Sequence, residues 1–171
     1  MKLPSSDISV VIDQLKKHFQ DRIISVNEQC TPLQIEIEHG SIFRVCEFLH
    51  EDEHCYFDHL ASISGIDNGP EKATMEVIYN LYSIPNNLSL MLKVEIPKDQ
   101  PEVKSLTPLW KGADWLERET YDLYGIIFEG HPDLRRILLP NDWEGYPLRK
   151  DYKHQEYYRG MKVQYEQQDP V

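Results

Sequence analysis

Two apolar segments, 75–83 and 88–96, set the architecture of this chain. Both are rich in Val, Ile, Leu and Tyr, and Pro85, Asn86 and Asn87 lie between them. β-Branched and aromatic residues favour strands, and a short link of turn-forming residues between two such runs is typical of a hairpin. The sequence therefore predicts an antiparallel β-hairpin.

The other periodic segments are a mixture of helical and strand patterns. Apolar residues at helical spacing predict three helices, at 8–19, 42–49 and about 109–124. Alternating or continuous apolar residues predict three further strands, at 22–26, 33–38 and 57–67. Because helices and strands do not alternate regularly, we expect an α+β fold, with a mostly antiparallel sheet and helices packed on one face.

The apolar pattern stops after Tyr146. At 171 residues the chain is most simply one domain, which we place at 1–146. Residues 147–171 contain four tyrosines and many charges but too few periodic apolar residues for another core element. We interpret this segment as an extended C-terminal arm that docks on a partner protein, and the alternative is disorder of its last fifteen or so residues in isolation.

The composition excludes several classes of function. The net charge of −11 argues against a nucleic-acid partner, which needs a basic face, although residues 134–163 carry seven Lys or Arg against four Asp or Glu. No apolar stretch approaches the ~20 residues of a membrane span, so we expect membrane association only through a partner. The three cysteines, Cys30, Cys46 and Cys55, lack the spacing of a metal or iron–sulfur site.

The third predicted helix carries a dense set of charges. At 3.6 residues per turn, the stripe expected to face the core consists of Leu109, Ala113, Leu116, Thr120 and Leu123. Asp114, Arg118 and Asp122 fall on the opposite face, flanked by Glu117 and Glu119. This face is either a solvated, ion-paired surface or a recognition element. Acid–base catalysis by these carboxyl groups is not expected, because neighbouring side chains on one helix diverge.

His50, Glu51 and His54 match the H-E-x-x-H spacing of zinc hydrolases. The two intervening residues, Asp52 and Glu53, are acidic where a buried zinc helix needs apolar packing, and no motif fixes a third ligand. We therefore favour a polar helix end and keep a zinc hydrolase that uses His50 and His54 as an alternative. No phosphate-binding glycine loop or nucleophile elbow is present in the sequence.

Several blocks of the sequence resemble the thirty-kilodalton subunit, also called the C subunit, of proton-translocating NADH:quinone oxidoreductase, respiratory complex I. The resemblance rests on Glu117-Arg118-Glu119, Asp122-Leu123-Tyr124-Gly125, His131, Arg135-Arg136-Ile137-Leu138 and Pro147-Leu148-Arg149-Lys150-Asp151-Tyr152. Upstream, 110–115 and 60–67 are similar to the segments that precede this block in the family.

The resemblance implies a non-catalytic structural subunit of the hydrophilic arm, in a complex that passes electrons from NADH through iron–sulfur centres to ubiquinone or another quinone. It implies no cofactor in this chain, with FMN and iron–sulfur clusters in partner subunits, and no catalytic or metal site here. The implied partners are the large quinone-site subunit, known as D, and the iron–sulfur subunits I and B, at the cytoplasmic side of the inner (plasma) membrane.

The resemblance also supplies candidate residues for the interface between subunits. These are Glu117, Arg118, Glu119, Asp122, His131, Arg135, Arg136, Arg149, Asp151 and Tyr152. The same sequence block is shared by related complexes. The alternative is therefore the C-like subunit of a membrane-bound hydrogenase or of a ferredoxin-driven complex.

Overall fold

The computed structural model describes residues 7–163. Its three α-helices are α1 (Ile8–Phe19), α2 (Ile42–Glu51) and α3 (Ala113–Tyr124). The strands of the main sheet are β1 (Ile23–Asn27), β2 (Gln34–Ile37), β3 (His59–Asp67), β4 (Thr74–Ser83) and β5 (Leu88–Pro97). Two small sheets pair β6 (Glu102–Lys104) with β7 (Ile127–Glu129) and β8 (Tyr157–Tyr158) with β9 (Met161–Lys162).

The main sheet has the strand order β1-β2-β5-β4-β3. The predicted hairpin is confirmed: β4 and β5 are antiparallel, with Thr74 opposite Pro97 and Ser83 opposite Leu88. Within this sheet β2 and β5 are the parallel pair, and the other neighbours are antiparallel. The expected α+β fold with a mostly antiparallel sheet is therefore confirmed.

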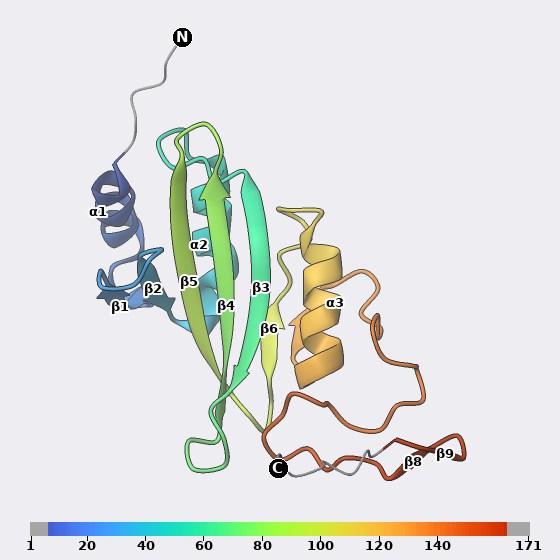
Figure 1. Cartoon of the computed structure of the whole chain (residues 1–171). Helices are drawn as coiled ribbons and strands as arrows, with labels where there is room; N and C mark the ends of the chain where they lie inside the picture. The colour runs from blue at the N-terminus through green and yellow to red at the C-terminus, as the bar shows by residue number, and fades with distance from the viewer. Residues whose placement is uncertain (1–6, 164–171) are drawn as a thin grey trace, which may run out of the picture.

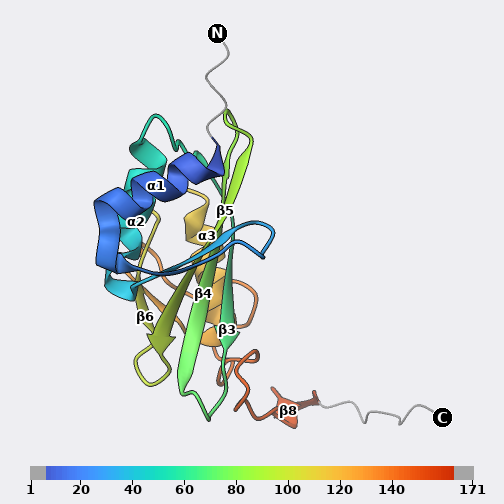
Figure 2. The same ribbon diagram turned by 90° about the vertical axis from the view of Figure 1, so that its left-hand side faces the viewer.

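The helices cover one face of this sheet, as Figures 1 and 2 show. Side chains of one register row, Ile63, Tyr79 and Leu92, point into the core and are at most 5% exposed. α2 adds its own buried apolar stripe, and α1 packs on α2 through an edge-to-face contact of Phe19 with Phe48. The opposite face is mostly polar, with Glu76, Asn80 and Lys93 among its residues, which is the usual pattern for an antiparallel sheet covered on one side.

The expected boundaries hold to within a few residues, except at the start of α3. The helix begins at Ala113, because residues 106–110 form a turn in which the N–H groups of Leu109 and Trp110 both donate to the carbonyl of Leu106. Its end is as predicted. Gly125 adopts a left-handed conformation (φ 71°) and its N–H donates to the carbonyl of Tyr121.

Residues 131–163 form an extended segment, which we call the strap. It runs from the end of β7 along α3 and then past the lower end of the main sheet (Figure 1). None of the apolar residues in the strap is fully buried. The predictions for residues 164–171 concern positions outside the described range. No helix between residues 7 and 163 is long and apolar enough to cross a membrane.

Candidate interface built by α3 and the strap

α3 lies close against β3 because of a glycine. A Cβ atom on Gly65 would lie 2.7 Å from the Tyr124 ring, a distance that real side chains do not tolerate. The last turn of α3 can therefore approach the strand directly. The helix buries Ala113, Glu117 and Thr120 against the rest of the domain.

The predicted orientation of α3 is wrong in two respects. Leu116 and Leu123, expected in the core, are only half-buried, whereas Glu117 and Asp122 are fully buried. The prediction places Asp122 on a solvated charged face, but in the structure it lies in the interior and accepts hydrogen bonds. Buried carboxyl groups are tolerated only where donors satisfy them, and both groups have such donors.

Glu117 fixes the chain that leads into α3. Its carboxylate accepts hydrogen bonds from Ser105 Oγ at 2.7 Å and from the backbone N–H of Leu106 at 2.6 Å. Burial raises the pKa of Glu117 to about 7, although these two donors favour the charged form. The nearby Tyr79 hydroxyl is buried without a hydrogen-bond partner in the described part of the chain. Glu117 therefore acts inside the domain.

Asp122 anchors the strap. Its Oδ2 accepts three successive backbone N–H groups, from Ile137 at 3.0 Å, Leu138 at 2.7 Å and Leu139 at 2.8 Å. Its Oδ1 accepts from the Arg136 guanidinium at 2.8 Å. Burial alone would raise the pKa of Asp122, but these donors outweigh burial and hold it below its ordinary value.

Arg136 closes the same turn from the other side. Besides binding Asp122, its guanidinium donates to the carbonyls of Trp143 at 3.0 Å and Gly145 at 2.9 Å, and it lies 5.2 Å from the Tyr146 ring. Arg and carboxylate form the strongest hydrogen-bonded pairs in proteins when both are shielded from water. Asp122 and Arg136 together define the path of residues 136–145.

Arg149 makes the next attachment. It donates to the carbonyls of Tyr124 and Gly125 at the end of α3 and stacks on Tyr146 at 4.7 Å. A Cβ on Gly125 would lie 2.5 Å from the Tyr146 ring. The glycine that ends the helix thus also admits the aromatic ring on which Arg149 rests.

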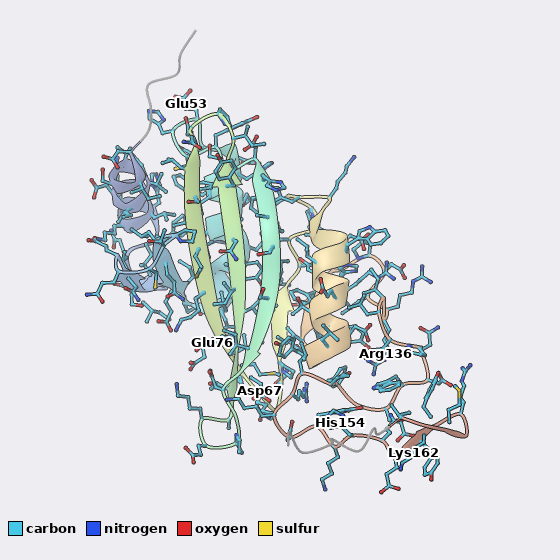
Figure 3. All side chains as sticks on the ribbon, in the orientation of Figure 1. Glu53, Asp67, Glu76, Arg136, His154 and Lys162 are labelled. Carbon is cyan, nitrogen blue, oxygen red and sulfur yellow. The ribbon has the colours of Figure 1, made fainter. Side chains whose placement is uncertain are left out.

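Asp67, at the end of β3, holds the strap at Lys150 (Figure 3). This carboxylate accepts from the backbone N–H groups of Gly69 and Lys150, both at 2.8 Å, and from Lys98 Nζ at 2.8 Å. Lys98 also lies 3.3 Å from Asp151. Burial would raise the pKa of Asp67, but Lys98 and the two N–H groups lower it. Sequence reasoning missed Asp67 and Lys98 as site residues, and a charged residue that ends an otherwise apolar strand was the available signal.

Four further predicted residues also have partners within the chain. Arg118 donates to the carbonyls of Arg135 and Arg136. His131 has a fully buried side chain whose Nδ1 accepts from the N–H of Asp133, so its Nε2 carries the proton and donates to the Asp114 carbonyl. Arg135 pairs with Asp133 on the surface, and the Tyr152 hydroxyl accepts from Trp143 Nε1. Glu119 is exposed.

Five large apolar side chains on α3 and the strap are exposed, which sequence reasoning also missed. The exposed fractions are 66% for Trp115, 61% for Leu138, 48% for Leu148, 60% for Tyr157 and 64% for Met161. We call these five residues the α3–strap surface. They come from α3 and from a strap with no buried apolar residue of its own. Leu and Met in an otherwise polar, non-periodic segment were the available signal.

The zinc alternative loses its geometric basis. α2 ends at Glu51, so His50 is helical and His54 is not, and the two imidazoles do not share a helix face. His50 packs edge-to-face on Trp110 at 5.2 Å, while the His54 side chain is 58% exposed. Residues 7–163 contain no group of three or more His, Cys, Asp or Glu side chains placed to hold a metal ion.

Fold and site together define a class of protein. It is an α+β domain with helices on one face of its sheet, and its buried charged residues hold the strap in place. Residues 35–158 match the family model described as "Respiratory-chain NADH dehydrogenase, 30 Kd subunit". This match covers well over half of the chain, so the chain belongs to the family of thirty-kilodalton subunits of respiratory-chain NADH dehydrogenase.

Curated relatives agree with this family. The chain is 42% identical over 153 residues to the C subunit of NADH-quinone oxidoreductase from Chloroherpeton thalassium, covering 88% of this chain and 63% of that protein. It is 41% identical over 145 residues to the corresponding protein of a Roseiflexus species, covering 85% of this chain and 83% of the relative. The C subunit of F(420)H(2) dehydrogenase from Methanosarcina mazei is 38% identical over 150 residues, with coverages of 86% and 92%.

Solved structures share the fold. A trypsin-resistant fragment (1-134) of Nqo5 superposes with a TM-score of 0.61 at 28% identity, covering 74% of this chain and 98% of the fragment. A chain of the membrane-bound sulfane sulfur reductase, an archaeal respiratory membrane complex, gives a TM-score of 0.75 at 20% identity, with coverages of 95% and 98%. At that identity the second likeness speaks for the fold alone.

Proposed function

We propose that this chain is the thirty-kilodalton structural subunit of a proton-translocating NADH:quinone oxidoreductase and supplies no catalytic group itself. The observation that carries the proposal is that most of the charged residues between 117 and 149 are bonded within the chain. Glu117 is sealed from solvent, and Asp122, Arg136 and Arg149 are hydrogen-bonded inside the chain. Groups held in this way shape a surface for assembly and do not reach a substrate.

In this proposal the α3–strap surface meets the partner. Full burial of an exposed apolar side chain is worth about 1.5–3 kcal/mol, so these partly exposed groups gain roughly half of that each when a partner covers them. Trp115 borders Arg118, whose guanidinium lies 6.0 Å from the Trp115 ring and donates to the carbonyl of Arg136, two residues before Leu138. We place the quinone-site subunit on this surface, with the iron–sulfur subunits I and B nearby. Of the charged candidates, Glu119, Arg135 and Asp151 are then left for the rim of the interface.

In this proposal the partner subunits bind the cofactors and provide the contact with the membrane. FMN and the iron–sulfur clusters would reside in other subunits, and this chain would reach the cytoplasmic side of the membrane only through the assembled complex. The local excess of Lys and Arg in 134–163 suits an acidic partner surface.

The first test is affinity purification of the tagged chain from its own cells in gentle detergent, with an assay of NADH:quinone activity. We expect the chain to co-purify at equal stoichiometry with a quinone-site subunit and iron–sulfur subunits. Recovery of the chain alone would contradict the assembly role.

A matched pair of variants tests the surface. Leu138→Asp should deplete the assembled complex several-fold, because it puts a charge into a desolvated contact. Ile24→Asp is the control, since Ile24 on β1 is exposed to a similar extent, 59% against 61%. Equal complex levels in the two variants would show that the α3–strap surface is not the interface.

A second candidate is a related complex with a different electron donor. The likeness to the F(420)H(2) dehydrogenase protein, which covers 92% of that relative, favours keeping it. A membrane-bound hydrogenase or a ferredoxin-driven complex belongs to the same group. Co-purified donor-side subunits distinguish these complexes, and oxidation of NADH by the purified material would exclude the alternatives.

A further inference from the structure

The end of the main sheet away from the strap carries a second rigid surface. The loops 52–58 and 84–87, which we call the tip, are bonded to each other. Asp58 Oδ1 accepts from the N–H of Ile84 at 2.8 Å, and the Cys55 carbonyl accepts from Asn86 Nδ2 at 3.2 Å. Within the first loop, Asp52 Oδ1 accepts from the N–H of His54 at 2.9 Å. The tip is therefore one structured unit.

The centre of the tip is apolar. Ile84 is 63% exposed and Tyr56 is 45% exposed, and the two lie on the cross-bonded stretches of the two loops. Pro85 is exposed beside Ile84. Apolar side chains that are held in place and left in water mark contact sites more often than scattered exposed ones do.

The surroundings of the tip are acidic. Residues 51–58 contain four Asp or Glu and no Lys or Arg. Glu53 is 88% exposed, and among residues 7–163 it forms no salt bridge with a Lys or Arg; the His54 ring lies 3.8 Å away. Figure 3 shows Glu53 at one end of the sheet and Asp67, His154 and Lys162 at the other. The tip and the seat of the strap at Asp67 therefore lie at opposite ends of the sheet (Figure 3).

We propose that the tip is a second docking surface, which binds a basic polypeptide segment of another chain with an apolar side chain seated on Ile84 and Tyr56. This inference rests on the proposed role in assembly and extends it to a second partner. Charge complementarity selects the occupant, because unneutralised carboxylates next to an apolar centre favour Lys or Arg in the partner. A second copy of the same tip and an anionic membrane are both repelled by the carboxylates. With the α3–strap surface as the first interface, the chain would join two partners of unlike charge.

Site-specific cross-linking in the native complex tests this directly. A photoreactive amino acid replaces Ile84 in the full chain, and Ile24 is replaced in the same way as the control for an exposed isoleucine away from the tip. After purification and illumination, mass spectrometry maps the cross-linked peptides. We expect position 84 to join one segment of another subunit with a net positive charge, and position 24 not to join that segment.

Every other outcome at position 84 overturns the proposal. These outcomes are the absence of a cross-link in an assembled complex, an acidic or neutral partner segment, a second copy of this chain, and the chain's own first residues. If the chain purifies without any partner, the proposed function fails instead, so the two failures are distinguishable.

A charge variant provides an independent measurement. Glu53→Lys combined with Ile84→Ser should weaken retention of the protein cross-linked at position 84 by about tenfold at moderate salt, which corresponds to ~1.4 kcal/mol. Glu28→Lys combined with Ile24→Ser is the matched control, because both of its residues are exposed on the β1–β2 side of the sheet. Equal retention in the two double variants would refute the docking surface. Circular dichroism on each purified chain verifies that the variants fold.

Discussion

Glu117→Gln should abolish a specific dependence of folding stability on pH. The pKa of Glu117 rises from 4.5 to about 7 on folding, because burial penalises the carboxylate. One pKa unit is worth ~1.36 kcal/mol, so the charged form costs roughly 3 kcal/mol of folding free energy. The folded state holds this proton to higher pH than the unfolded state. The stabilising contribution is therefore complete below about pH 4.5 and is lost as pH rises through about 7.

Glutamine keeps the hydrogen-bonding geometry but cannot lose a proton. Its carbonyl oxygen can accept from the N–H of Leu106, and its amide can donate to Ser105 Oγ, which is free to rotate. The variant should therefore match the parent near pH 4.5 and exceed it by about 2–3 kcal/mol near pH 8.

The assay is urea unfolding of the full chain at four pH values between about 5 and 8, followed by tryptophan fluorescence. Glu119→Gln is the control for removing a carboxylate from the same helix, because Glu119 is exposed. A Glu117→Gln difference that stays constant over this range would refute the reasoning, because it would show that the carboxyl group does not titrate in the folded core.

Three other changes test the strap and its seat. Asp122→Ala removes the carboxylate that accepts from Arg136 and from three backbone N–H groups, so trypsin should cleave the strap at least tenfold faster while the sheet stays folded. An unchanged rate would show that Asp122 does not hold the strap. Gly65→Ala forces a methyl group against the Tyr124 ring and should lower the free energy of unfolding, measured by thermal unfolding, by about 1–3 kcal/mol. Adding Tyr124→Leu should recover part of this loss. Full stability of Gly65→Ala would contradict the close contact. Asp67 has a pKa held below its ordinary value, so its contribution is present above the unfolded-state pKa and is lost as pH falls through the folded-state pKa. Hydrogen exchange of the Lys150 amide, corrected for intrinsic pH effects, should lose protection in that acidic window, and retained protection would count against this anchor.

Local pattern determined the three helices and the strands of the main sheet, but not the short strands β6 to β9. The β4–β5 hairpin, the three helices and the stop at Gly125 all follow from spacing and turn chemistry within a few residues of each position. The residue block from Glu117 to Tyr152 likewise identified the family, because that match depends only on the order of residues. None of these inferences needs a contact between distant parts of the chain.

Tertiary structure alone decided which charges are internal. Glu117 and Asp122 are polar by type, so periodicity assigns them to the surface. They are buried because backbone N–H groups 11 to 17 residues away supply the donors that water would otherwise provide. The parallel pairing of β2 with β5 and the seating of the strap on Asp67 are decided in the same way. Such partners lie far apart in sequence, and a pattern that repeats every two or four residues carries no information about them.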